Sequence, residues 1–192
     1  MNAGMGMLQV LGTMNQKRRR QGQVPISIGI GIHTGPVVFG TLGFEERMDS
    51  TVLGDAVNLA SRLESLTKYY GASLLFSDQT YEALGDEKEN LLIRKIDTVM
   101  VKGRKQAVKI YELFNSDSLD VQSAKKMVMQ SLEEPLSLYR QKKWIEAEQL
   151  FTDLARNQPL DSLPAIYVER CQNLLENPPS DDWAGVHVFN QK

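Results

Sequence analysis

Two polar side chains that could act together on a phosphorylated sugar stand four residues apart, at Asn58 and Arg62. Residues four apart on a helix point in the same direction, so the two would form a polar pair on one helix edge. A guanidinium donates several N–H groups in a fixed geometry that suits a crowded phosphoryl group, and a carboxamide can hold a sugar. On one rigid helix such a pair can be positioned tightly. Taken alone, an Asn and an Arg on a helix edge are also common as plain surface residues, so the surrounding sequence has to decide.

The helix that carries this pair is predicted over residues 56–69. Its apolar residues recur at the i, i+3, i+4, i+7 spacing of a helix face, and they are Ala56, Leu59, Ala60, Leu63 and Leu66. Gly54 and Asp55 lead into the helix, and Gly71 supplies its end. Asn58 and Arg62 therefore fall beside the apolar stripe.

An alternating segment upstream predicts a strand over residues 26–32. Its isoleucines are Ile26, Ile28, Ile30 and Ile32, and the residues between them are small or polar. Gly29 and Gly31 leave one face nearly bare, which permits another backbone or a ligand to approach closely. The glycine spacing is not that of a dinucleotide-binding fingerprint, because the third glycine is one residue late and no helix clearly follows. His33 ends the segment as a turn residue rather than as a base.

The remaining pattern alternates strands and helices. We predict a helix over 3–18, a short helix over 78–84, and strands over 50–53, 73–77, 93–101 and 108–114. Such alternation favours an α/β or α+β sandwich. Beyond Asn115 the sequence is first polar and then helical with no clear strand, so we place a boundary near residue 120. The expected domains are residues 1–116 and a small all-α tail over 120–192.

The tail contains a spacing that resembles the closing half of a tetratricopeptide unit. Lys142, Trp144, Ala147 and Phe151 carry it, followed by Ala155 and Pro159. Only one repeat matches, and one repeat cannot bury its own apolar face. A helical hairpin packed on the preceding domain is therefore favoured over an independent peptide-binding array.

Composition narrows the class of protein. The net charge is −2, from 22 basic and 24 acidic residues among 192, which gives no electrostatic reason to expect a nucleic acid partner. The single cysteine, Cys171, cannot form an internal disulfide, and no Cys/His spacing suggests a zinc site. No apolar run approaches the ~20 residues that cross a bilayer. We expect a cytoplasmic protein with no membrane segment in this chain.

Residues 54–64 resemble the signature of the class III nucleotidyl cyclases. Three further segments are similar to the same family in the same order, namely residues 29–35, 48–52 and 101–104. The resemblance covers about residues 3–115 and implies an α+β sandwich of the ferredoxin-like kind, with helices on one face of a mainly antiparallel sheet. The family's first strands should precede the matched region, so the domain over 1–116 is expected to be N-terminally incomplete. The helical tail is similar to tails of some bacterial members.

The resemblance implies an adenylate cyclase, a phosphorus–oxygen lyase that converts ATP to cyclic AMP and pyrophosphate in intracellular signalling. Its sites lie at a dimer interface and are built from both subunits. Asn58 matches the family's ribose-positioning Asn, and Arg62 its transition-state Arg. Lys102 matches the position that holds the β- and γ-phosphates, although a lysine in a Lys-Gly-Arg turn is often simply solvated. Thr51 falls at the purine-contacting position, where a hydroxyl can accept from the adenine 6-amino group, and this favours ATP over GTP.

The metals are the main departure from the family. In these enzymes two Mg²⁺ or Mn²⁺ ions, held by a pair of aspartates, activate the ribose 3′-hydroxyl and polarise the α-phosphate. Both aspartates belong to segments before the helix predicted over 3–18, and Asp49 and Asp55 fall at positions not known as ligands. We therefore expect no metal ligand in this chain, aspartates supplied by a missing upstream segment or a partner chain, and no turnover by this chain alone.

Three hypotheses remain open. The chain is the C-terminal piece of a complete adenylate cyclase, whose partners are ATP and a second copy or another cyclase chain. Alternatively it is a non-catalytic cyclase-homology module that pairs with a full cyclase and supplies Asn58, Arg62 and Lys102 in trans. In the third, the tail is a scaffold that binds partners and the α/β part is vestigial.

Overall fold

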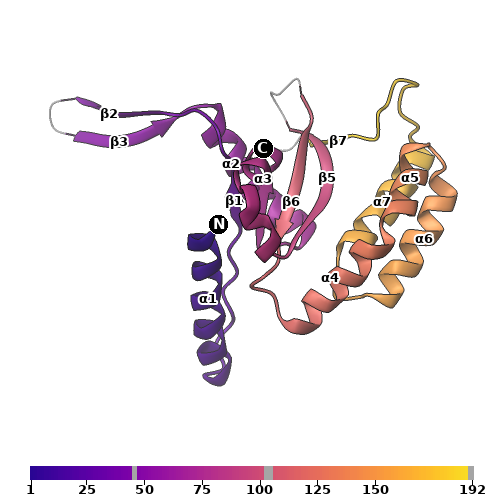
Figure 1. Cartoon of the computed structure of the whole chain (residues 1–192), viewed down its shortest axis with the longest axis horizontal. Helices are drawn as coiled ribbons and strands as arrows, with labels where there is room; N and C mark the ends of the chain where they lie inside the picture. The colour runs from indigo at the N-terminus through magenta and orange to yellow at the C-terminus, as the bar shows by residue number, and fades with distance from the viewer. Residues whose placement is uncertain (45–46, 102–105, 190–192) are drawn as a thin grey trace. The chain divides into compact units, whose positions relative to one another are not determined.

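The computed structural model describes residues 1–44, 47–101 and 106–189 (Figure 1). The chain divides into two compact units, Met1–Lys95 with Lys109–Leu113 as unit 1, and Ile96–Val108 with Phe114–Lys192 as unit 2. The mixed α+β architecture with C-terminal helices confirms the predicted fold class. The boundary near residue 120 stays a prediction, because the division by contacts passes instead through two strands of the sheet.

Unit 1 is built around a core of Leu74, Phe76 and Leu113. The helix predicted over 3–18 is confirmed as α1 (Asn2–Arg20), and it lays Met1, Met5 and Leu8 against this core. Gly4 is buried in the contact, where a Cβ would stand 2.9 Å from Leu74 Cδ1. One side of α1 thus packs against the core of unit 1, whereas Met7, Val10 and Met14 are exposed.

The first strand is shorter than predicted. β1 covers Ile30–Ile32 only, so the prediction of a strand from residue 26 is wrong. The N–H of Ile26 donates to Asn15 Oδ1 at 2.8 Å, and Asn15 Nδ2 donates to the Ile26 carbonyl at 2.7 Å. Because the side-chain amide of Asn15 satisfies both backbone groups of Ile26, this residue is tied to α1 and not to a strand.

The sheet of unit 1 joins parallel and antiparallel pairs. β1 is parallel to β4 (Leu74–Ser77), and β4 is antiparallel to β6 (Val108–Leu113). β5 (Ile93–Val101), which runs from unit 1 into unit 2, and β7 (His187–Phe189) of unit 2 complete the strand order β1-β4-β6-β5-β7. All four residues of β4 are buried, as expected of a central strand under helices.

A hairpin leaves this sheet between β1 and the next helix. β2 (Val38–Phe44) and β3 (Arg47–Leu53) pair antiparallel, with Val38 opposite Leu53 and Gly40 opposite Thr51. The strand predicted over 50–53 is therefore the second half of a two-stranded arm (Figure 1). Val38 is 69% exposed and Phe39 is 72% exposed, so the base of the arm presents apolar surface to its surroundings.

Helices cover the sheet of unit 1. α2 (Asp55–Tyr70) packs on β1 and β4, and α3 (Asp78–Ala83) packs beside β4 ahead of the 3₁₀ helix η1 (Gly85–Asn90). Ser77 caps α3, since its hydroxyl accepts from the backbone N–H of Thr80 at 3.3 Å. Both helices lie where the sequence predicts them.

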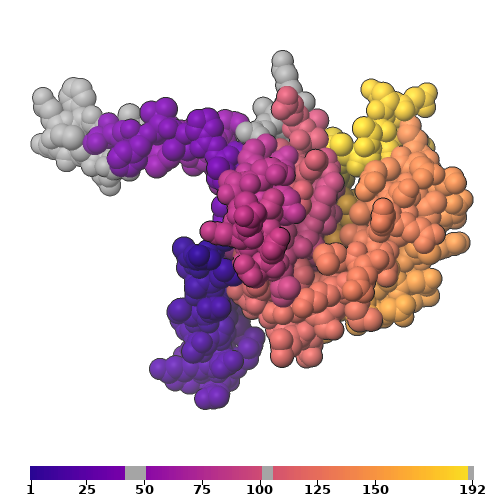
Figure 2. All heavy atoms as spheres, viewed as in Figure 1, coloured from indigo at the N-terminus to yellow at the C-terminus, as the bar shows by residue number. Residues whose placement is uncertain are grey.

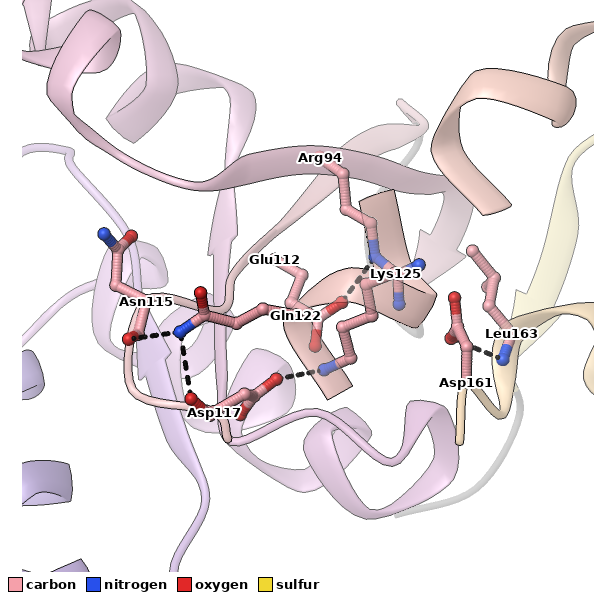
Figure 3. Close-up of polar contacts among 8 residues, drawn as sticks. All are labelled: Arg94, Glu112, Asn115, Asp117, Gln122, Lys125, Asp161 and Leu163. Carbon is pink, nitrogen blue, oxygen red and sulfur yellow. Dashed lines mark hydrogen bonds and ion pairs between the residues drawn. The ribbon is translucent and has the colours of Figure 1, made fainter. Parts of the chain in front are cut away.

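A buried ion pair ties β5 to β6 in unit 1. Arg94 Nε donates to Glu112 Oε2 at 2.7 Å, and both side chains are about 2% exposed (Figure 3). Removing one partner of such a pair leaves an uncompensated charge in the interior, so the two strands are held in register at this point.

Unit 2 contains the helices α4 (Leu119–Ser131), α5 (Glu133–Arg140), α6 (Trp144–Asn157) and α7 (Leu163–Glu176). α6 packs between α5 and α7 and buries Trp144, Ala147 and Phe151, the apolar members of the predicted helical spacing. Among the residues that the structure describes, no helix is long and apolar enough to cross a bilayer.

Short polar contacts fix the starts of two of these helices (Figure 3). Gln122 Nε2 donates to the carbonyls of Asn115 at 3.0 Å and Asp117 at 2.9 Å, and Lys125 Nζ pairs with Asp117 Oδ2 at 2.5 Å. At α7, Asp161 Oδ1 accepts from the N–H of Leu163 at 3.1 Å. Hydrogen bonds and an ion pair therefore hold the segments that precede α4 and α7.

The tail also contains a strand. The tail is helical as predicted apart from one short strand, since β7 (His187–Phe189) is parallel to β5, with Val99 opposite His187. Three residues are too few for an alternating pattern, and β7 forms because β5 offers a free edge to pair with.

Buried polar contacts hold α7 to β5 within unit 2. Arg170 Nη1 pairs with Asp97 Oδ2 at 2.6 Å, and both side chains are 4% exposed. The hydroxyl of Tyr167 donates to the Ile96 carbonyl at 3.1 Å. Burial, with the nearby Asp97 carboxylate second, raises the pKa of Tyr167 well above 10.0, so the phenol stays a donor.

Replacing Arg170 with Leu should lower the free energy of unfolding by about 3–5 kcal/mol, because it strands the buried Asp97 carboxylate. Chemical denaturation of the purified chain measures the loss. Arg156→Leu is the matched control, since Arg156 lies 4.0 Å from Asp153 on the surface, where a pair contributes about 0–1 kcal/mol. Equal losses in the two variants would contradict the assignment.

The attachment of β7 should weaken in acid. Burial first, and the Arg170 charge second, lower the pKa of His187 from 6.5 to about 4, while Asp97 opposes the shift. The unfolded chain therefore takes up its proton at higher pH than the folded chain, so stability is intact above about pH 6.5 and falls toward pH 4. Thermal unfolding over this range should show a shallower pH slope in His187→Gln, and identical slopes would refute the prediction.

Candidate functional site

The close approach of α2 to β1 places the candidate site. A Cβ on Gly31 would overlap the carbonyl oxygen of Ala60 and the backbone nitrogen of Glu64. A Cβ on Gly29 would overlap the hydroxyl of Thr67 and stand 3.1 Å from the Glu64 carbonyl oxygen. The bare face of the strand, predicted to admit a backbone or a ligand, admits the backbone of α2.

Gly54 fixes the point at which α2 begins. Its φ of 152° lies in a region that residues with a side chain rarely adopt, and a Cβ there would stand 3.2 Å from the Pro36 carbonyl oxygen. The Gly54 carbonyl accepts from the N–H groups of Val57 at 3.2 Å and Asn58 at 3.4 Å. Asn58 is thereby held in the first turn of the helix.

The two faces of α2 separate as the sequence predicts. The buried residues include Ala56, Leu59, Leu63 and Leu66 from the predicted stripe, with Thr67 and Tyr70 added. Asn58 is exposed and Arg62 is partly buried, and their Cβ atoms are about 5–6 Å apart by helix geometry. Neither side chain is hydrogen-bonded to another residue within the described ranges. Both side chains therefore lie beside the buried face of α2, as predicted.

Thr51 lies on the hairpin and not on α2. It is partly buried on β3, and its partner across the hairpin is Gly40. A Cβ on Gly40 would meet nothing within 4 Å, so the strand position opposite Thr51 is open. β3 ends at Leu53 and α2 begins at Asp55, so only Gly54 separates the hairpin from the helix. Thr51 therefore lies close in the chain to the start of α2.

His33 organises the turn between β1 and the hairpin, a contact that the sequence alone does not indicate. Its Nδ1 lies 2.7 Å from Ser77 Oγ, and the hydroxyls of Thr34 and Thr80 lie 3.1 Å apart. Ser77 Oγ is also 3.3 Å from Thr80 Oγ1. The turn is thus bonded to the start of α3, and the only hint in the sequence is the Ser77-x-x-Thr80 capping pattern.

Lys102, the predicted phosphate-binding residue, lies outside the described residues and directly follows the end of β5 at Val101. In the described part of the chain, no group of three or more His, Cys, Asp or Glu side chains could hold a metal ion. The structure thus brings Asn58 and Arg62 together and leaves the positions of Lys102 and of any metal ligands open.

Comparison with known proteins gives the class to which this fold and site belong. The family described as adenylate and guanylate cyclase catalytic domain matches residues 1–115, which is more than half of the chain. The chain belongs to this family of class III nucleotidyl cyclase domains.

Three relatives illustrate the similarity. An adenylate cyclase of Anabaena cylindrica is 47% identical over 118 residues, which cover 59% of this chain and 23% of that protein. The terminal-differentiation specific adenylate cyclase of Dictyostelium discoideum is 38% identical over 150 residues, covering 78% of this chain and 7% of that protein. The crystal structure of the guanylyl cyclase Cya2 superposes with a TM-score of 0.50 at 37% identity, covering 57% of this chain and 53% of that one. The chain thus spans less than a quarter of the length of these two curated relatives.

Replacing Gly31 with Ala should lower the free energy of unfolding by about 1–3 kcal/mol or more and displace α2, because the new methyl group overlaps its backbone. Denaturant unfolding measures the loss. Gly12→Ala is the control, since a Cβ at this position in α1 meets nothing within 4 Å and alanine favours helix by up to about 1 kcal/mol. A neutral Gly31→Ala variant would show that α2 does not rest on the glycine face.

Proposed function

We propose that this chain supplies one half of an adenylate cyclase site, which converts ATP to cyclic AMP and pyrophosphate in signalling. The observation that supports this most directly is the side-by-side placement of Asn58 and Arg62 on a helix whose start and depth are fixed by backbone contacts at Gly54 and Gly31. Hydrogen-bond donors that are already in position before the reaction stabilise the charge that develops in the transition state.

In this proposal the two side chains have separate tasks. Arg62 directs its guanidinium fork at the α-phosphate, where the pentavalent transition state gathers negative charge. Asn58 holds the ribose with the ribose 3′-hydroxyl facing the phosphorus atom. This orientation reduces the entropy that is lost on reaching the transition state. Lys102 acts as a point charge on the β- and γ-phosphates and so favours departure of pyrophosphate.

Divalent metal belongs to the other half of the proposed site. When bound, Mg²⁺ or Mn²⁺ supplies nucleophile activation and charge neutralisation. Asp49 and Asp55 fall at positions not known as ligands in the family, so we assign the carboxylates for this ion to another segment or another chain, and assign turnover to the assembled pair. This chain alone is then inactive.

We assign ATP rather than GTP as the substrate because of Thr51. A hydroxyl at this position can accept from the adenine 6-amino group. The two curated relatives described above are named adenylate cyclases, whereas the similar crystal structure is of a guanylyl cyclase. The fold is therefore shared by both activities, and the support for ATP comes from the residue.

The exposed arm supports the need for a partner chain. Val38, Phe39 and Leu53 leave apolar surface uncovered at its base, and such surface marks contact with another protein. We propose that the partner is a second copy or another cyclase chain, and that the pair forms in the cytoplasm.

The test is cyclic AMP production from Mg²⁺- or Mn²⁺-ATP by this chain mixed with a class III cyclase that lacks its own transition-state Arg but keeps both metal aspartates. We expect activity only in the mixture and a loss of about 10²–10³-fold for Arg62→Ala, the usual effect of removing one transition-state donor. Lys68→Ala is the control, because Lys68 is an exposed cation on the same helix.

Two outcomes would count against the proposal. Activity of this chain alone would place metal ligands within it. Stable pairing without turnover in the mixture would favour the second candidate, a non-catalytic cyclase-homology module.

A further inference from the structure

The last described part of the chain lies as an extended peptide on the helices of unit 2. We call residues 180–189 the C-terminal segment, and the side chains of Tyr139, Arg140, Lys142 and Trp144 the aromatic face. The segment runs past α5 and α6 and then continues as β7 (Figure 1). In the space-filling view it lies on the outer surface beside α5 and α6 (Figure 2).

Trp183 is the anchor of this contact. Its ring packs edge-on against Tyr139, with centroids 5.3 Å apart, and against Trp144, with centroids 5.9 Å apart. Its Nε1 donates to the Val186 carbonyl at 3.1 Å, so the segment satisfies the polar atom of its own anchor. Aromatic pairs of this geometry add to the stabilisation that burial of the rings gives.

Lys142 recognises the backbone of the segment rather than its side chains. Its Nζ donates to the carbonyls of Ser180 at 3.2 Å and Asp181 at 2.9 Å. Lys142 has a φ of 62°, and it is the one residue other than glycine with a positive φ among those described. A non-glycine residue in this conformation costs about 1 kcal/mol or more and persists where the surroundings demand it. Here the strained backbone carries the side chain that holds the segment.

Gly185 sets a second requirement on the sequence of the ligand. Its φ is 76°, and a Cβ would stand 2.9 Å from Arg140 Cγ. The face thus admits a tryptophan followed two residues later by glycine. Arg140 selects the glycine, because it leaves no room for a Cβ at that position, and the rings of Tyr139 and Trp144 select the tryptophan.

The present ligand leaves one group of the face unsatisfied. Trp144 is 9% exposed, and its Nε1 has no hydrogen-bond partner within the described ranges. A buried donor without an acceptor costs about 1–3 kcal/mol. A segment with a differently placed carbonyl could therefore bind the same face better than the resident one.

We propose that the aromatic face is a binding site for extended peptide segments that carry tryptophan followed two residues later by glycine, with the C-terminal segment as its resident ligand in cis. A partner bearing such a segment displaces the resident one and releases β7 from β5. The proposal does not depend on cyclase activity and can fail or succeed independently of it.

The test uses the full chain and a labelled peptide of residues 180–186, Ser-Asp-Asp-Trp-Ala-Gly-Val, which contains the anchor but not β7. Fluorescence anisotropy should show binding at least tenfold tighter to the Trp183→Ala chain than to the wild-type chain, because the variant frees the face without altering it. The Gly185→Val chain should behave in the same way while keeping its tryptophan. Val188→Ala is the control, since Val188 is 53% exposed and should leave binding at the wild-type level.

A second measurement needs no variant. Saturating peptide added to the wild-type chain should speed amide hydrogen exchange at Val99–Val101, the residues opposite β7, while a peptide with alanine for tryptophan should not. A wild-type dimer that the peptide dissociates would also support the site, with a second copy supplying the ligand. Equal binding to wild-type and Trp183→Ala chains, or no binding to a variant with wild-type circular dichroism, would overturn the proposal.

Discussion

The distance between two backbones, those of β1 and α2, governs where unit 1 can present its polar side chains. Because Gly31 has no side chain, Ala60 and Glu64 of α2 lie so close to β1 that a Cβ at position 31 would overlap their backbone atoms. Burial of Leu59 and Leu63 then follows on one face of α2, and Asn58 and Arg62 are turned toward the other. A larger residue at position 31 would push α2 away from β1 at Ala60 and Glu64, next to Arg62. The glycines of the strand therefore matter to the site although they cannot touch a ligand.

The sequence predicts the parts of this arrangement that depend on local pattern. The apolar stripe of α2 and the capped start of α3 are periodic or punctuated features, and the structure contains both. The strand expected from Ile26 is wrong because Asn15, eleven residues earlier, binds the backbone of Ile26. β7 is not predicted because a strand of three residues is too short to show an alternating pattern. It forms through pairing with β5, where Val99 lies opposite His187. The pairing of Asn58 with Arg62 follows from helix spacing, whereas the turn around His33 depends on Ser77, 44 residues away.

Two buried ion pairs connect β5 to its neighbours. Arg94 with Glu112 joins β5 to β6, and Arg170 with Asp97 joins α7 to β5. Such pairs contribute little net stability compared with apolar residues of equal size, but breaking one of them is costly. Their effect is to disfavour alternative registers, since a shifted strand would leave each partner unpaired. Both pairs involve β5, so this strand is held to β6 at one point and to α7 at another.

β5 is also the element through which the two proposals meet. Its first residues belong to unit 1 and its later ones to unit 2, and the chain passes from Val101 directly into Lys102. The C-terminal segment pairs with the last three residues of this strand. If Lys102 binds substrate phosphates, and if phosphate binding is stronger when β5 is paired with β7, then phosphate binding and segment binding favour one another equally, because linkage between two sites is reciprocal. A partner that removes the segment would then weaken phosphate binding by the same factor.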